Sequence, residues 1–526
     1  MRTSNALAVA CVLAAQVTVA NAGSQSAAIT AASQKNFAEY LQLLSLPNLP
    51  AEPRDILRNV EFLEQSFGKR NFKTQRLDNA AGRPLLFAEL NGARPAAATI
   101  LFYAHFDGQP VVDSEWAQKD PFEPIVKQRD EQGAWQEVPR ERLTAKPFDP
   151  ELRVFARSAS DDKAPIMMLL TALDVLQSQG KRPAINVKVL LDSEEEISSP
   201  SLAGVVEANA QLFDADALVV LDGPQHASGK PTLVFGNRGI TQASLTVFGP
   251  RAPLHSGHFG NYAPNPAQRL AALLASMKDD DGRVLVAGYY DGIELTDADR
   301  RVLAATGDDE AALRKRAGIA RAERVGENYQ EALQYPSLNV RGMASASVGA
   351  KAANIVPAEA IAEIDIRTTP ETDGRRLFEL LKSHIEKQDY HLTDGAPTEE
   401  QRASYDKLAM FKLGSVQAAQ RVPMDAPVGR WAMTALRSAT APAPGADLVS
   451  RGIPSAARPA SRDPVRIRMM GGTVPTDVLV DALGLPFLLV PTVNADNNQH
   501  AYDENMRLGN FVTGTEIIYS LMLTKY

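Results

Sequence analysis

The sequence contains almost no cysteine, because Cys11 is the single one among 526 residues. Cys11 lies in an apolar run from Ala6 to Ala20, which precedes the small residues Ala20-Asn21-Ala22. This arrangement is typical of an export signal that is cleaved after Ala22, since a membrane anchor needs about 18 or more apolar residues. Lipidation of Cys11 is a weaker alternative. A chain that begins at Gly23 would have no cysteine, which excludes disulfide scaffolds, thiol nucleophiles and cysteine-ligated zinc. We therefore expect an exported protein, periplasmic or secreted.

The chain also lacks an excess of positive charge. It has 55 Lys and Arg against 63 Asp and Glu, which gives a net charge of −8 and a pI near 5.6. Without a basic field, nucleic acid and anionic membrane surfaces are excluded as partners. Glycine and proline, at 34 residues each, are present at the usage of ordinary globular chains. Histidine is scarce, with seven residues, so a metal site has few imidazoles to draw on.

The first half of the chain alternates between strand-like and helix-like segments. Ala96–Ala104 is an apolar run of strand length, and residues 164–177 carry apolar side chains at helical spacing. Ala184–Leu191 and Ala217–Leu221 return to strand character. This order predicts an α/β domain with a mixed, largely parallel sheet flanked by helices.

The pattern changes near Gly239. Gln242–Phe248 and Ala358–Arg367 alternate like half-exposed strands, and an amphipathic helix over 267–276 lies between them. These segments predict an inserted α+β domain with one sheet face covered by helices. Residues 394–462 have weak periodicity and are interpreted as a long excursion, after which 485–493 gives one more buried strand.

Polar residues cluster directly after the predicted strands of the α/β domain. Each has a structural explanation when taken alone: an acidic pair at a helix start is a common N-terminal cap, and an acidic triplet on a loop is usually solvated. Ligands of open α/β sheets, however, gather outside the carboxyl ends of the strands, where all of these residues are expected. Imidazole and carboxylate ligands, with one further carboxylate as a general base, are what a pair of divalent ions requires. The candidates are His105, Asp107, Asp161, Asp162, Glu194, Glu195, Glu196, Asp222 and His500.

The motifs resemble a known family at this point. Ala104-His105-Phe-Asp107-Gly-Gln-Pro-Val, Ser158-Ala-Ser-Asp161-Asp162-Lys163, Ser193-Glu-Glu195-Glu196-Ile-Ser-Ser and the late His500 look like those of a co-catalytic metallopeptidase family. Glutamate carboxypeptidase, carnosine dipeptidase and aminoacylase belong to it. The elements occur in the family's order from about residue 35 onward. The sequence departs from the family pattern at Ser158 and Ala164, where glycines are usual.

The resemblance implies a role for each residue of the cluster. Asp161 would bridge two divalent ions in each subunit, followed by a non-proline cis peptide. His105 and Asp222 would complete the ligands of one ion, and Glu196 and His500 those of the other. Glu195 would be the general base, and Asp107 would orient the His105 ring. Zinc is the favoured metal, with manganese or cobalt as alternatives.

The inserted domain resembles the family's lid and dimerisation domain. His255, in Leu254-His255-Ser256-Gly257, would reach the active site of the partner subunit in a homodimer, and Arg367 would bind the substrate's α-carboxylate. Asn354, Gly472 and Thr473 match substrate-contacting positions more loosely. The expected division is a signal peptide at 1–22, catalytic segments at 23–240 and 394–526, and the lid and dimerisation domain at 241–393.

These expectations describe an exported di-metal dipeptidase or carboxypeptidase that acts on short peptides with a free C-terminal carboxylate. An N-acyl-amino-acid amidohydrolase, similar to aminoacylase, is the alternative, because it would use the same ions and base. A non-catalytic binding protein on the same fold is a third possibility, and the complete set of base and ligands argues against it. The sequence leaves the preferred side chains of the substrate open.

Overall fold

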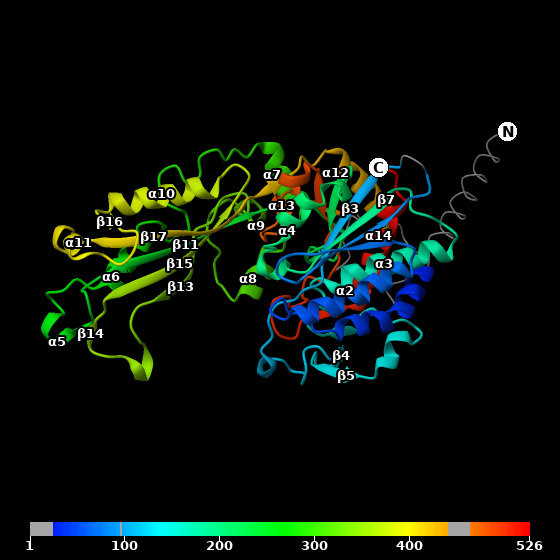
Figure 1. The fold of residues 1–526 in the computed structure, drawn as a ribbon, viewed down its shortest axis with the longest axis horizontal. Coiled ribbons are helices and arrows are strands. Elements are labelled where there is room, and N and C mark those ends of the chain that lie inside the picture. Colours follow the sequence, from blue (N-terminus) through cyan, green and yellow to red (C-terminus); the bar gives the residue numbers. More distant parts are fainter. Residues whose placement is uncertain (1–24, 95–96, 440–462) are drawn as a thin grey trace. The chain divides into compact units, whose positions relative to one another are not determined.

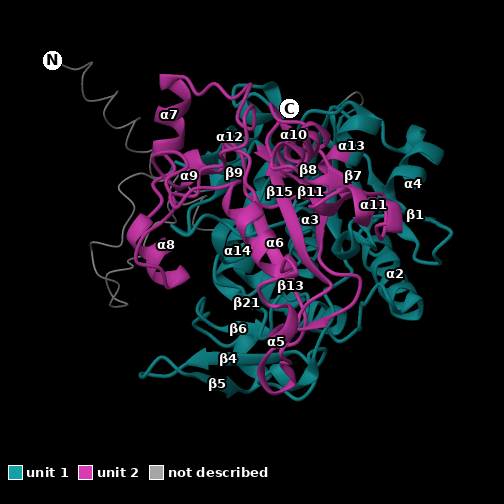
Figure 2. Cartoon of the chain, turned by 90° about the vertical axis from the view of Figure 1, so that its left-hand side faces the viewer, with its two compact units in different colours: residues 1–235, 422–467, 478–526 teal, residues 236–421, 468–477 magenta. Residues whose placement is uncertain are grey.

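The computed structural model describes residues 25–94, 97–439 and 463–526, so the predicted signal peptide lies outside the described residues. The chain forms two compact units (Figure 2). Unit 1 comprises Met1–Phe235, Val422–Ile467 and Val478–Tyr526, and unit 2 comprises Gly236–Arg421 and Arg468–Asp477. Among the helices of the described part, none is long and apolar enough to cross a membrane.

Unit 1 is built on an eight-stranded sheet with the order β1-β2-β7-β3-β8-β20-β9-β19. Strands β3 and β7 of this sheet are labelled in Figure 1. The central pairs β7–β3, β3–β8 and β8–β20 are parallel, whereas β1–β2, β2–β7 and β20–β9 are antiparallel. The predicted mixed, largely parallel sheet is therefore confirmed. Its strands are β1 (Lys73–Leu77), β2 (Leu85–Leu90), β3 (Thr99–His105), β7 (Asn186–Asp192), β8 (Ala217–Val220), β9 (Thr232–Val234), β19 (Val465–Ile467) and β20 (Phe487–Leu489).

The helices of unit 1 bury their apolar side chains against this sheet in one hydrophobic core. Helix α3 (Lys163–Ser178) is apolar on nearly all sides and almost entirely buried, as expected of a helix enclosed by other elements. Helix α14 (Leu508–Leu523) packs beside it and contributes Phe511 and Ile518 to the same core. The remaining elements are a helix over 25–44, α2 (Pro53–Gly68), α4 (Leu202–Ala208), α12 (Pro427–Ala439), α13 (Thr476–Leu483, which begins in unit 2), and a small sheet of β21 (Asn505–Arg507), β6 (Arg153–Phe155), β4 (Ile125–Arg129) and β5 (Trp135–Val138).

Unit 2 contains a five-stranded sheet with the order β13-β15-β11-β17-β16. Burial alternates along β15, and its inward residues Ala362 and Ile364 share a core with Leu273 of α6 and Leu381 of α10. The predicted half-exposed sheet with helices on one face is thus confirmed. The strands are β11 (Gly239–Phe248), β13 (Asn339–Ala344), β15 (Glu359–Thr368), β16 (His391–Leu392) and β17 (Leu408–Gln417), and the main helices are α6 (Pro266–Ala275) and α10 (Gly374–Lys387).

Shorter elements complete unit 2. Two strand pairs lie outside the large sheet, β10 with β18 and β12 with β14. Strand β17 falls within the segment interpreted as an excursion, whose residues 440–462 are outside the described part of the chain. The bounds are β10 (Gly236–Asn237), β12 (Leu254–His255), β14 (Ile355–Val356), β18 (Gln420–Arg421), α5 (Ser256–Phe259), α7 (Asp297–Ala304), α8 (Glu310–Ala317), α9 (Tyr329–Ala332) and α11 (Glu399–Ser404).

Candidate active site

The polar residues singled out in unit 1 come together at one edge of the large sheet. Strand β3 ends at His105, β7 is followed by Glu195 and Glu196 on a single 3-10 turn, and β8 is followed by Asp222. Because β7, β3 and β8 are neighbouring parallel strands, their carboxyl ends lie at the same edge. Asp161 lies just before α3, which begins at Lys163. The Asp161–Asp162 peptide bond is cis, as the resemblance implied.

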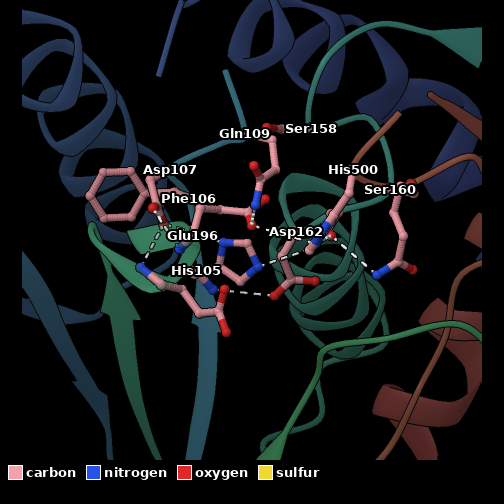
Figure 3. Close-up of polar contacts among 12 residues, drawn as sticks. His105, Phe106, Asp107, Gln109, Ser158, Ser160, Asp162, Glu196 and His500 are labelled. Carbon is pink, nitrogen blue, oxygen red and sulfur yellow. Dashed lines mark hydrogen bonds and ion pairs between the residues drawn. The ribbon is translucent and has the colours of Figure 1, made fainter. Parts of the chain in front are cut away.

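Two groups of metal-type ligands form at this edge. His105, Asp161 and Asp222 make one group, and Asp161, Glu196 and His500 make the other, with the ligand atoms of each group within 4.8 Å of one another. His105 Nε2 lies 2.9 Å from Asp161 Oδ1, and His500 Nε2 lies 3.2 Å from Asp161 Oδ2 and 3.4 Å from Glu196 Oε2 (Figure 3). Asp161 thus presents one oxygen to each group, which is the geometry of a bridging carboxylate.

Negative charge exceeds positive charge in this cluster. Burial, reinforced by the charge of Asp161, raises the pKa of Glu196 to about 8 and that of Asp222 to about 6. Burial likewise holds the pKa of Glu195 well above its usual range. Burial opposes ionisation of Asp161 too, but hydrogen bonds with His105 and His500 lower its pKa below the usual range. Buried carboxylates that crowd one another in this way fit a divalent cation, because its charge would stabilise all of them in the ionised form.

Asp107 connects the first strand to the turn that carries the glutamates. Its Oδ1 lies 3.3 Å from His105 Nδ1, on the side of the ring opposite Asp161. The same carboxylate accepts backbone hydrogen bonds from Glu195, at 3.1 Å, and from Glu196, at 3.0 Å. Asp107 therefore holds the turn of the glutamates through two backbone hydrogen bonds and lies close to the imidazole, and the first of these contacts was not predicted from the sequence.

The sequence reasoning missed Glu504, which is fully buried four residues after His500. Its Oε2 accepts hydrogen bonds from Arg157 Nη1 at 2.8 Å and from the Ser158 amide at 2.9 Å. Its Oε1 accepts from the amides of Ser160 and Asp161 and from the Ser160 hydroxyl, at 2.8 to 2.9 Å. One carboxylate thus holds the whole loop that presents Asp161. The only signal in the sequence was its closeness to His500.

Two glutamines contact the candidate ligands directly and were also missed. Gln109 Nε2 donates to Glu196 Oε2 at 2.6 Å (Figure 3). Gln499 Nε2 donates to Asp161 Oδ2 at 3.2 Å. Gln109 belongs to the motif around His105, and Gln499 precedes His500, so both were within reach of a motif-based search. Each amide contacts the carboxylate oxygen that also faces His500.

The candidate residues of unit 2 fall into two places. His255 on β12 lies beside Asn354, since β12 pairs with β14 and the Ser256 amide donates to the Asn354 carbonyl at 2.9 Å. Arg367 lies near the end of β15, where its Nη1 donates to Thr473 Oγ1 at 2.7 Å, and Gly472 is the neighbour of Thr473. These two places are at opposite ends of the β11–β15 ladder, because β14 immediately precedes β15.

Comparisons with known proteins agree with this arrangement. Residues 235–393 match the model of the peptidase dimerisation domain, M20_dimer. The Cys-Gly metallodipeptidase dug1 of Schizosaccharomyces pombe is 25% identical over 493 residues, which is 90% of this chain and 92% of that protein. The human Beta-Ala-His dipeptidase is 25% identical over 311 residues, or 58% of this chain and 56% of that one. The structure of the M20 family metallo-carboxypeptidase Sso-CP2 from Sulfolobus solfataricus has a TM-score of 0.70 at 25% identity and covers 93% of this chain and 98% of its own.

The expectation of export requires a correction. The yeast Dug1 dipeptidases that match most of this chain are cytosolic enzymes, which contradicts a periplasmic or secreted location. The prediction depended on one alanine-rich apolar run at 6–20, a compositional pattern that does not by itself determine export. That run, with Cys11, lies outside the described residues.

The site and the comparisons lead to the same class of protein. The ligand groups at the sheet edge suit divalent metal ions, and the similarity to named metallodipeptidases extends over nine-tenths of the chain. The chain is a metal-dependent peptidase that is similar to the M20 metallopeptidases, in the dimerisation domain at residues 235–393 and over nine-tenths of its length.

Proposed function

We propose that this chain is a dipeptidase that uses two divalent ions and acts on short peptides with a free C-terminal carboxylate. The observation that carries the proposal is the position of Asp161 between two ligand groups, with one oxygen facing each. His105 and Asp222 are the proposed further ligands of one ion, and Glu196 and His500 those of the other. Zinc is the favoured metal, with manganese or cobalt as alternatives.

Glu195 is the proposed general base. It lies beside the two ligand groups and is half-buried, and none of the ion pairs of the described residues involves it. Two bound divalent cations would polarise the substrate's carbonyl group and lower the pKa of a water molecule toward neutrality. The Glu195 carboxylate takes the proton from the attacking water and returns it to the leaving amine, so that one group serves both proton transfers. Asp107 keeps the His105 ring and the turn of Glu195 in place throughout.

Arg367 is the proposed anchor for the substrate's C-terminal carboxylate, with Thr473 and Gly472 as further contacts. Asn354, which lies beside His255, would contact the substrate in the site of the partner subunit. A guanidinium presents paired N–H groups that match the two oxygens of a carboxylate. Thr473 already holds one of these nitrogens in place. An arginine fixed in this way loses little conformational freedom when the ligand binds.

A homodimer is proposed because His255 is far from Arg367 within the same unit. The register pairs Ile240 with Arg367 and Phe248 with Glu359, so the two ends of the ladder are separated by eight residues. At about 3.4 Å per residue this corresponds to roughly 27 Å, more than one dipeptide spans. His255 would therefore stabilise the oxyanion in the site of the partner subunit. The match to a dimerisation domain supports this assembly.

The division of the chain into catalytic segments at 23–240 and 394–526 and a lid at 241–393 remains a proposal. The compact units support an inserted domain, although unit 2 extends to Arg421 and also includes Arg468–Asp477.

A substrate panel tests the proposed activity. The purified protein is incubated with dipeptides and with N-acyl amino acids, with added zinc, manganese or cobalt and separately with a chelator, and released amino acids are measured by mass spectrometry. We expect chelator-sensitive release from dipeptides that carry a free amine. Release from N-acyl amino acids alone would favour the amidohydrolase alternative, and bound metal without any hydrolysis would contradict both.

A further inference from the structure

Arg238 is a buried arginine without a carboxylate partner. It lies between β10 and β11 and is only 7% exposed. Among the described residues its side chain donates a single hydrogen bond, from Nη2 to the Tyr335 carbonyl at 2.6 Å. Its Nε is buried and unpaired, and within the described residues no ion pair involves Arg238. Burying a guanidinium without an anion is costly, so such a residue is kept where a ligand supplies the missing charge.

Arg238 and Arg367 belong to the same corner of the sheet. Ile240 pairs with Arg367, and Arg238 lies two residues before Ile240, which makes the two arginines diagonal neighbours on one face. Thr473 connects them, because its hydroxyl accepts from Arg367 Nη1 at 2.7 Å and donates to the Arg238 carbonyl at 2.8 Å. Burial, together with the nearby charge of Arg367, lowers the pKa of Arg238 to about 10, so Arg238 remains protonated at neutral pH.

Two other partly buried arginines of unit 2 have the partner that Arg238 and Arg367 lack. Arg421 pairs with Glu371 at 2.5 Å, and Arg468 lies 3.4 Å from Asp299. The carboxylate of Asp365 raises the pKa of Arg238 through its charge, without a direct ion pair. Asp365 accepts a hydrogen bond from Asn339 and forms no ion pair among the described residues. Arg367 likewise has no ion pair in the part of the chain that the structure describes. The corner therefore carries two positive charges that are not neutralised.

We propose that Arg238 and Arg367 together bind two carboxylates of one substrate, the C-terminal carboxylate and that of an acidic C-terminal side chain. Two guanidiniums exceed what a single carboxylate needs, whereas a C-terminal glutamate or aspartate matches both charges. The inference rests on the proposed function and adds a substrate class to it. Neutral C-terminal residues engage Arg367 alone.

Paired substrates of equal shape test the specificity. Alanyl-glutamate and alanyl-glutamine differ only in the charge of the C-terminal side chain, and we expect the KM of the native enzyme to be about 10-fold lower for the glutamate peptide, as for one added charge-assisted contact. Arg238→Gln should raise the KM for alanyl-glutamate to that for alanyl-glutamine and leave kcat little changed. Arg238→Lys should keep part of the preference. Arg269→Gln removes a half-buried arginine that pairs with Asp406, and serves as the matched control in which the preference is unchanged.

Equilibrium binding separates this inference from the proposed function. Calorimetry with metal-free protein should detect tighter binding of glutamate than of glutamine, and Arg238→Gln should abolish the difference. Equal KM values for the two peptides in the native enzyme, or a preference that survives Arg238→Gln, would overturn the inference while leaving a dipeptidase. Absence of hydrolysis of every dipeptide would instead refute the proposed function, and binding of glutamate would still be measurable.

Discussion

Three consecutive glutamates have different surroundings. Glu194 is fully buried, and its carboxylate pairs with Arg83 at 2.6 Å. The carboxylate also accepts a hydrogen bond from the Ser201 amide, so Glu194 holds the turn in place. Glu196 faces His500, and Glu195 is crowded by Asp222 and Glu196. An acidic triplet on a loop looks like solvated surface in the sequence, and only the resemblance to a family distinguished its members. Burial, which no local pattern encodes, is what separates the three residues physically.

Replacing Glu195 with glutamine should abolish turnover without loss of metal. The amide cannot take a proton from water, so we expect kcat to fall by about 10²- to 10⁴-fold. The change keeps the shape of the side chain, so the metal content measured by inductively coupled plasma mass spectrometry should equal that of the native protein. Glu207→Gln, at an exposed position of α4, is the matched control. Near-native kcat with normal metal content would show that Glu195 is not the base.

At the scale of elements, the long and strongly patterned segments could be predicted and the short ones could not. The residues of β3, α3, β7, β15 and α10 are apolar at regular spacing, and their positions follow from the sequence. Strands β9 and β19 have three residues each, which is too few for a period to be recognised. Strand β17 is ten residues long, but its burial does not alternate, so its place in the sheet of unit 2 is decided by pairing with β11.

The loop that carries Asp161 depends on a contact that no local pattern encodes. Glu504 and the Arg157–Asp161 loop are more than 340 residues apart, and they meet through a set of hydrogen bonds that all end on one carboxylate. In Glu504→Gln the side-chain NH₂ group replaces one of the two carboxylate oxygens, and each of these oxygens accepts at least two hydrogen bonds. Whichever way the amide is turned, the NH₂ group therefore faces other hydrogen-bond donors. We expect the loop to shift and the metal affinity measured by calorimetry to fall by about 10- to 100-fold.

Glu39→Gln is the control for a purely structural loss. Glu39 pairs with the buried Arg70 elsewhere in unit 1, so its removal should lower the melting temperature and leave the metal affinity unchanged. Native metal affinity in Glu504→Gln at a reduced melting temperature would show that Glu504 only stabilises the fold.

For the whole molecule, the proposed dimer predicts complementation between two inactive variants. His255→Ala and Glu195→Gln should each be inactive alone and remain dimeric by light scattering. In a mixed dimer, the chain with His255→Ala keeps Glu195 and receives His255 from its partner, so one of the two sites is complete. Random exchange at equal concentrations should therefore restore about a quarter of native activity. No recovery despite subunit exchange, or full activity of a monomer, would contradict the role of His255.

The pH dependence of stability should reflect Glu516 on α14. Burial raises its pKa to about 7 from 4.5, and none of the hydrogen bonds or ion pairs of the described residues involves it. The folded state therefore binds more protons than the unfolded state between these values, and stability falls as pH rises from 4.5 to 7. Glu516→Gln should stabilise the protein by about 1–3 kcal/mol at pH 8 and have little effect at pH 4.5, as measured by urea unfolding. An equal effect at both pH values would contradict this assignment.

The order of strands in unit 1 also affects how the protein is made on the ribosome. Strand β20 lies between β8 and β9 in the sheet, yet it follows both in the sequence, after the segment Gly236–Arg421 of unit 2. Until β20 has been synthesised, β8 lacks its neighbour in the sheet, and the backbone groups of β8 that pair with β20 are exposed. Unit 2 can close earlier, because most of it ends at Arg421. We expect nascent chains that stop before β20 to be the form most dependent on chaperones.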